Sequence, residues 1–428
     1  MRATFVLLHR WAGLTTALFL FITGLTGAVI SWDHELDEWL NGHLLDATTP
    51  ITAEHQPQPV MQLIEQVEQR HPTMQVLYTS LTSEPGHSYS FYVAPRLNPD
   101  TNKPYDADFN QVFVDPVSGD ELGTREWGAV WPISTETFVS FLYKLHYSLH
   151  LPEMWGINEW GVWLLGIIAM IWTLDCFFGI VLTFPKTKTQ RGENASQKTR
   201  NWFSNWFKRF GIRWNGGSYK LNFDLHQAVS LWTWGLLLIV AFTAFSLNLY
   251  REVFFPALSA ISDVTPTPYD ERPYVELHEV KPPQLSMQQA IDIASERAEQ
   301  LGWEEPANAV FYARQFGFYD IKLYHPEDDH GTAGAGHKEL FVDAYSGEIL
   351  GKRIPWQGTV ADLFVQAQFP LHSGRILGLP GRILISFMGL VVAMLSVTGV
   401  IIWWRKRKAR VASQRKQQQK QQSEAAYS

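Results

Sequence analysis

Cysteine is nearly absent from this chain of 428 residues, which contains only Cys176. A single thiol excludes an intramolecular disulfide and any cluster held by several thiolates, such as an iron–sulfur centre. The 14 histidines therefore make up most of the available transition-metal ligands. Rossmann and P-loop fingerprints are missing as well. The glycine-rich run at 331–336 superficially resembles a phosphate-binding loop, but it opens no expected helix. We therefore expect no site for NAD(P)H.

Charged residues are scarce in four long stretches of the chain. These apolar runs cover 11–32, 160–185, 225–250 and 383–404, and Asp175 is the only Asp, Glu, Lys or Arg inside them. Each run exceeds the ~20 residues needed to cross ~30 Å of hydrocarbon. The first run is longer than a usual signal-peptide core and lacks a clear cleavage site, so we expect a retained anchor. The sequence thus predicts four membrane spans.

Basic residues are concentrated on one side of these spans. Segment 186–220 has nine Lys or Arg against one acid, and 405–428 has eight against one. By contrast, 33–159 has five basic and 19 acidic residues, and 251–382 has 11 and 19. The positive-inside rule then predicts cytoplasmic termini, a cytoplasmic middle loop and two acidic domains outside. The net charge of -7 disfavours nucleic acid as a partner.

The two acidic domains contain similar segments. The run FVDPVSGDELG at 113–123 matches FVDAYSGEILG at 341–351, and both predict two strands around a Ser-Gly turn. An amphipathic helix is expected upstream of each, near Met61 and Met287, which are 226 residues apart. Alternating aromatic strands are expected between helix and turn. We therefore expect two repeats, each with a small α+β domain of one helix over a few antiparallel strands.

Four Leu-His pairs fall at equivalent places of the two repeats and supply the candidate ligands: His9, His226, His146 and His372. The first two open the first and third spans. The last two follow the glycine of the Ser-Gly turn by 27 and 25 residues and precede the second and fourth spans. A single such pair carries little information, but four in matched positions indicate a shared role.

The expected organisation divides the chain into alternating membrane and soluble segments. In order, these are span one at 8–32, an outer domain at 33–140, a histidine segment with span two at 141–185, a basic loop at 186–224, span three at 225–250, a second outer domain at 251–365, a histidine segment with span four at 366–404, and a basic tail at 405–428 that we expect to become disordered.

Six short motifs are spread over nearly the whole sequence: LHRW at 8–11 with Gly24 and Gly27, LHYSLH at 145–150, DCFFG at 175–179, NFDLH at 222–226, LHSGR at 371–375 and GLPGR at 378–382. In these motifs the chain resembles the PepSY-associated transmembrane proteins, which include PiuB-like iron-regulated inner-membrane proteins and ferric-siderophore reductases. In the third-span motif, Gln227 and Ser230 stand where the family often has Arg and Gly. The resemblance implies a bacterial inner-membrane location and outer domains of the PepSY type.

Paired histidines favour haem as the cofactor. Spans one and three run the same way, so we expect His9 beside His226 at the cytoplasmic edge and His146 beside His372 at the periplasmic edge. Two facing imidazoles can occupy both axial positions of one iron, which favours electron transfer over oxygen binding. Because no C-x-x-C-H motif is present, two non-covalent b-type haems are expected. The alternative is that each histidine merely bonds a backbone or lipid group.

Two further residues deserve separate hypotheses. His150 lies four residues beyond His146, so a continuing helix would place both on the same face. His150 is then the true ligand, an alternate ligand or a donor to a haem carboxylate, and the repeat favours His146 because no histidine follows His372 by four residues. Asp175, deep in span two, is either a group for proton or quinone chemistry or a packing residue with a partner on another helix. Possible aromatic steps between the two haems are Trp163, Trp232 and Phe242.

Three functions from different classes remain. The resemblance implies an oxidoreductase that takes electrons from quinol or a cytoplasmic reductase and reduces a periplasmic ferric siderophore or other ferric chelate. One alternative is a non-enzymatic, membrane-anchored PepSY protein that binds a peptide or partner. The other is a permease subunit for the siderophore. Membrane lipids surround the chain in every case. The loop His325–His337 is expected to be a solvated hairpin tip, and a weaker alternative is that it holds a metal ion or contacts a ferric ligand.

Overall fold

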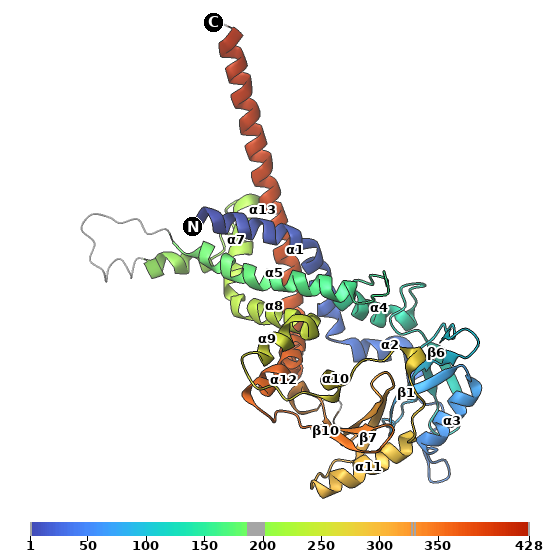
Figure 1. The fold of residues 1–428 in the computed structure, drawn as a ribbon. Coiled ribbons are helices and arrows are strands. Elements are labelled where there is room, and N and C mark those ends of the chain that lie inside the picture. The colour runs from blue at the N-terminus through green and yellow to red at the C-terminus, as the bar shows by residue number, and fades with distance from the viewer. Residues whose placement is uncertain (1, 186–201, 327, 329–330, 427–428) are drawn as a thin grey trace.

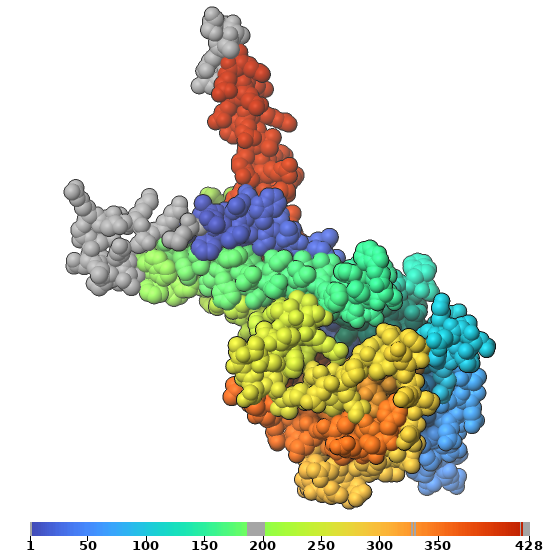
Figure 2. Space-filling model, viewed as in Figure 1, coloured from blue at the N-terminus to red at the C-terminus, as the bar shows by residue number. Residues whose placement is uncertain are grey.

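The computed structural model describes residues 2–185, 202–326, 328 and 331–426, and these form two layers (Figure 1). One layer is a group of long apolar helices, and the other is an α+β body at one end of them. Figure 2 shows this body packed against the helices, while the C-terminal half of the last helix projects alone. The predicted basic loop falls partly in 186–201, outside the described residues.

Most of the helical layer consists of five elements that contain long apolar runs: α1 Arg2–Ile30, α5 Trp160–Thr183, α7 Ser218–Trp232, α8 Trp234–Asn248 and α13 Leu379–Ala426. Among the described residues, three helices are long and apolar enough to cross a membrane, and α7 with α8 makes a fourth if the bent pair counts as one span. The prediction of a helical membrane protein with an α+β part is thus confirmed.

The predicted third span is not one straight helix. Helices α7 and α8 meet at Thr233 with a bend of 74°. The Thr233 hydroxyl donates to the carbonyl of Val229 at 2.7 Å, and such local bonding competes with the regular helical ladder. The indole of Trp234 donates to the carbonyl of Cys176 on α5 at 2.9 Å, which fixes the direction of α8 after the bend. Hydropathy alone contains no signal for this break.

The prediction of a disordered tail is also wrong. Helix α13 continues from the apolar fourth span through the basic segment to Ala426. Strong helix formers such as Arg, Lys, Gln and Ala dominate 405–426, with no Gly or Pro to stop the helix. The composition was therefore compatible with a helix that extends beyond the span.

The α+β layer contains one continuous sheet of eight strands in the order β10-β9-β8-β7-β1-β2-β5-β6. The bounds are β1 Met74–Ser80, β2 Tyr89–Pro95, β5 Gln111–Val114, β6 Glu121–Arg125, β7 Ala307–Ala313, β8 Phe318–Leu323, β9 Lys338–Asp343 and β10 Ile349–Arg353. A separate pair is formed by β3 Leu97–Asn98 and β4 Lys103–Pro104. Helices α3 Val60–Arg70 and α11 Met287–Gln300 pack apolar faces on the large sheet.

Each half of the chain contributes one helix and four antiparallel strands, but they do not form separate domains. Strand β1 pairs with β7 through Tyr78–Phe311, Thr79–Val310 and Ser80–Ala309, so the halves share one sheet. Pairing of these two strands removes an exposed edge from each half, and unpaired edges are costly. The expectation of two separate modules therefore misses their fusion.

The repeated Asp-x-x-Ser-Gly motif is explained by a buried carboxylate at the turn. In each half one aspartate oxygen accepts two backbone N–H groups, with Asp115 bound to Val117 and Ser118, and Asp343 bound to Tyr345 and Ser346. The second oxygen of Asp115 accepts the N–H groups of Thr48 and Thr49. These hydrogen bonds favour the charged form and hold the pKa of Asp115 well below its usual value.

We expect Asp115→Asn to destabilise the folded chain by about 2 kcal/mol at neutral pH, because an amide cannot accept at both positions. A lowered carboxyl pKa stabilises the fold only above the unfolded value near ~3.9, and this stabilisation disappears as the pH falls below it. Thermal unfolding of the purified protein should therefore show a difference from wild type at pH 7 that shrinks toward pH 3. Asp120→Asn, at an exposed turn position, should have little effect.

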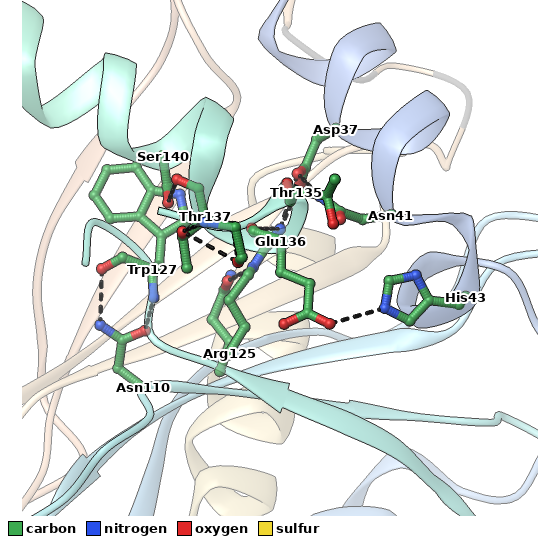
Figure 3. A network of polar contacts seen from close by, with 12 residues as sticks. Asp37, Asn41, His43, Asn110, Arg125, Trp127, Thr135, Glu136, Thr137 and Ser140 are labelled. Carbon is green, nitrogen blue, oxygen red and sulfur yellow. Dashed lines mark hydrogen bonds and ion pairs between the residues drawn. The ribbon is translucent and has the colours of Figure 1, made fainter. Parts of the chain in front are cut away.

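The two short helices that carry the second histidine pair are fixed to the α+β layer at their N-termini. For α4, Thr135–Ser148, the buried Arg125 donates to both oxygens of Asp37 at 2.8 and 2.9 Å and to the carbonyl of Glu136 at 3.2 Å (Figure 3). Asp37 belongs to α2, Asp33–Leu45. For α12, Val360–Ser373, Asp362 accepts the backbone N–H of Thr265 at 2.7 Å. Both helices are therefore oriented from the sheet side.

The helices α1 and α13 approach most closely at two glycines. A Cβ atom added at Gly24 would lie 2.7 Å from the carbonyl oxygen of Gly389, and one added at Gly389 would overlap the backbone of Gly24. Small residues allow such close packing of helices in membranes, where burial of apolar surface does not drive association.

Gly24→Val should separate α1 from α13 and lower stability by roughly 2–3 kcal/mol through overpacking. Gly13→Val is the matched control on the same helix, because nothing lies within 4 Å of a Cβ there. Thermal unfolding in detergent should show a clear loss for Gly24→Val only. Equal losses in both variants would show that helix propensity, and not the crossing, is responsible.

Candidate functional site

The structure brings the four histidines of the Leu-His pairs together two by two. The ring centroids of His9 on α1 and His226 on α7 are 6.4 Å apart, and those of His146 on α4 and His372 on α12 are 6.1 Å apart. The angle between the ring planes is 54° in both pairs. Each pair joins one residue of the first half to its counterpart in the second.

Three of these rings donate through Nδ1 to a threonine on a neighbouring helix: His146 to Thr26 at 3.1 Å, His372 to Thr243 at 3.0 Å and His226 to Thr398 at 3.0 Å. Each threonine hydroxyl donates its own proton to a carbonyl one turn earlier, so it can only accept from the ring. We therefore assign the Nδ1–H tautomer to all three. The lone pair of Nε2 then remains for a ligand.

The fourth ring has a charged partner. His9 Nδ1 lies 2.9 Å from both carboxylate oxygens of Asp175 on α5. A carboxylate only accepts, so this ring is also assigned the Nδ1–H tautomer. Asp175 therefore has a partner on another helix, as an ionisable residue inside a membrane span requires. Of the four, this contact alone resembles the carboxylate–histidine arrangement that tunes a metal ligand.

Glycines stand behind three of the rings. An added Cβ at Gly27 would lie 2.8 Å from Cε1 of His146, one at Gly399 would lie 3.2 Å from Cε1 of His226, and one at Gly179 would lie 3.6 Å from Cε1 of His9. The imidazoles thus pack directly on a neighbouring helix backbone. The glycines that the sequence repeats late in the second and fourth spans have this steric role.

A largely apolar cavity of about 490 Å³ surrounds the His146–His372 pair. Leu20, Ile168, Trp172 and other apolar residues of five helices line it, and Asp33 and Arg375 are charged residues in its lining. An apolar space with a cationic group in its lining suits a flat, amphipathic cofactor with carboxylates at one edge. At the other pair, Arg10 Nε is buried with no hydrogen-bond partner among the described residues.

The pairs fit the two axial ligands of one metal ion. Rings bound from opposite sides through bonds of about 2 Å have centroids roughly 6 Å apart, since each ring centre lies about 1 Å behind its nitrogen. In the described part of the chain, the only group of three or more His, Cys, Asp or Glu close enough to share an ion is His34, Glu38 and Glu84. Neither pair therefore has the further protein ligands of a zinc site, and a macrocycle that supplies the remaining positions fits.

A family model described as the PepSY-associated TM region matches residues 6–406. The chain belongs to this family. The match includes all four paired histidines and both halves of the sheet, and it agrees with the resemblance carried by the sequence motifs. A comparison with curated proteins finds no match.

In this PepSY-associated chain His150 belongs to neither pair. Helix α4 ends at Ser148, and Leu149 and His150 both adopt positive φ, so His150 does not share the face of His146. Its Nε2 donates to the carbonyl of Phe141 at 2.8 Å, and its ring stacks on the Phe141 ring with centroids 4.6 Å apart. The prediction of a continuing helix here is wrong because the chain turns sharply after Ser148.

None of the predicted aromatic steps is among the described residues that line the His146–His372 cavity. Trp232 is 72% exposed, Trp163 donates to Glu252, and Phe242 packs against Phe254. Trp172, which the sequence did not single out, lines the His146–His372 cavity and also packs in the apolar cluster around Cys176.

The weaker metal prediction for the loop at 325–337 cannot be placed as a unit, because 327, 329 and 330 lie outside the described residues. His337 is described, and its ring stacks on Tyr324 with centroids 3.8 Å apart.

Proposed function

We propose that this chain is a di-haem b electron-transfer protein of the bacterial inner membrane that reduces a ferric siderophore or another ferric chelate in the periplasm. The observation that carries the proposal is the set of four half-buried imidazoles, all assigned as Nδ1–H tautomers, in two pairs with nearly the same ring separation and the same angle. Histidines with merely structural roles would have no reason to share these features.

When bound, haem would supply one-electron chemistry at iron, and ligation by two imidazoles would favour electron transfer over oxygen binding. His9 and His226 would hold one haem, and His146 and His372 the other. The threonines and Asp175 fix the ring tautomer and orientation. Arg375 lines the apolar cavity, where it would pair with a haem carboxylate.

The charge distribution supports cytoplasmic termini and a periplasmic sheet, so that the His9 pair lies toward the cytoplasm. His9 and Thr26, which bonds His146, are 17 residues apart on one helix, so the pairs are separated by about 25 Å along it. Oxidation of one quinol to quinone would release two electrons and two protons, enough to reduce two Fe(III) ions to Fe(II). A cytoplasmic reductase is the other class of donor. Fe(II) is bound more weakly by hard oxygen ligands, so reduction favours release of the metal.

The first test is a reduced-minus-oxidised absorbance spectrum of protein expressed with ample haem, together with a pyridine haemochrome count. We expect two b-type haems per chain. His226→Ala and His372→Ala should each lose one, because each removes an axial ligand, whereas His150→Ala should keep both. A colourless wild-type protein would refute the proposal and favour an anchored PepSY protein that binds a partner, or a permease subunit.

A second test uses the charge of Asp175. The hydrogen bond from His9 to Asp175 would make the imidazole a more basic ligand and would stabilise the oxidised metal. Asp175→Asn should therefore raise the midpoint potential of one haem by roughly 30–60 mV, equivalent to about 1 kcal/mol, and leave the other unchanged. Thr26→Val should affect only the other haem. Spectroelectrochemical titration measures both, and a shift of the two potentials together in Asp175→Asn would contradict the assignment.

A further inference from the structure

A second cleft, of about 580 Å³, lies between the sheet and the helices that carry the second histidine pair. Its floor is the face of the sheet at the junction of the two halves, where Tyr78 of β1 and Lys322 of β8 point into it. Its wall is α12. Leu247, Phe369 and Arg375 line both this cleft and the His146–His372 cavity, so the two spaces adjoin.

Cationic side chains dominate the charged lining of this cleft. Lys322, Arg353 and Arg375 contribute three positive charges, and Glu84 is the only carboxylate among the described residues that line the cleft. Arg353 is partly neutralised by Glu339 at 3.3 Å, and Arg375 lies 3.8 Å from Asp33. Lys322 forms no ion pair within the described ranges. Cations therefore outnumber carboxylates among the described residues that line the cleft, and Lys322 in particular favours an anionic ligand.

Aromatic rings form the rest of the recognition surface. Tyr324 and His337 stack with centroids 3.8 Å apart at 14°, which gives a flat double-ring wall. Tyr78 and Phe369 line other sides, and the guanidinium of Arg375 lies 5.7 Å from the centroid of Phe369. Planar aryl groups pack well on such rings, and aryl oxygens that carry negative charge suit the adjacent cations.

We propose that this cleft binds the ferric chelate, and that it selects an anionic chelate whose iron donors are aryl oxygens, such as catecholates, over neutral or cationic hydroxamates. This inference rests on the proposed function for its choice of a ferric ligand. The volume lies within the usual range of small-molecule sites. Arg353 and Lys322 are specificity-determining residues, and Phe369 with Arg375 separates the ligand from the histidine cavity.

The test uses Ga(III) chelates, which have the charge and shape of the Fe(III) forms but do not undergo reduction. Binding of Ga(III) tris-catecholate and of a Ga(III) trihydroxamate to the purified full chain is measured by isothermal titration calorimetry. We expect the catecholate to bind at least about tenfold more tightly. Lys322→Glu should weaken binding of the catecholate by about tenfold or more. Tyr78→Leu should also weaken catecholate binding, whereas Tyr78→Phe should not.

Lys352→Glu is the matched control, because Lys352 is exposed and its neighbour Arg353 points to the other face of β10. Equal affinity for both chelates, or equal effects of Lys322→Glu and Lys352→Glu, would overturn the proposal. Because Ga(III) binding needs no electron transfer, catecholate binding by a protein without haem would leave the cleft assignment intact and refute the redox function. A protein that carries two haems but binds both chelates equally would support the redox function and refute the cleft assignment.

Discussion

The close crossing of α1 and α13 at Gly24 and Gly389 is the constraint on which both histidine pairs depend. Helix α1 carries His9 toward one end and Thr26, the partner of His146, toward the other. Helix α13 carries Thr398, the partner of His226. The contact at the two glycines therefore fixes the relative positions of groups at opposite ends of α1. A bulkier residue at the crossing would move a ligand support at each end, which is why the smallest side chain is required there.

The sequence predicts the histidine positions better than their surroundings. Equivalent Leu-His pairs identified the four rings, and the direction of the spans paired them as the structure does. Their hydrogen-bond partners were missed, although Thr26 and Thr243 each follow their repeat's first histidine by 17 residues. That spacing was a readable signal. The bend at Thr233 and the turn after Ser148 were not readable, since both depend on contacts with distant segments.

The shared sheet was beyond sequence reasoning for a different reason. Alternating patterns identify strands within each half, but the choice of which edges pair is a tertiary property. The β1–β7 junction creates the floor of the cationic cleft, so the candidate substrate site could not be seen before the fold. Tyr78 and Lys322 come from different halves and lie 244 positions apart. Neither residue stands out by type or by local pattern.

The two halves differ in the surroundings of their histidines. Within the membrane, three histidines bond neutral threonines, and only His9 bonds a carboxylate, so the two sites have unequal electrostatics. Outside it, Arg375 follows His372 by three residues, whereas Leu149 follows His146 at the same spacing. Arg375 lies close in sequence to His372, and no cation takes the equivalent position after His146. The cleft that Arg375 lines therefore adjoins the histidine of the second half. A symmetric pair of halves could conduct equally either way, so under the proposed function these two departures would distinguish a donor end from an acceptor end.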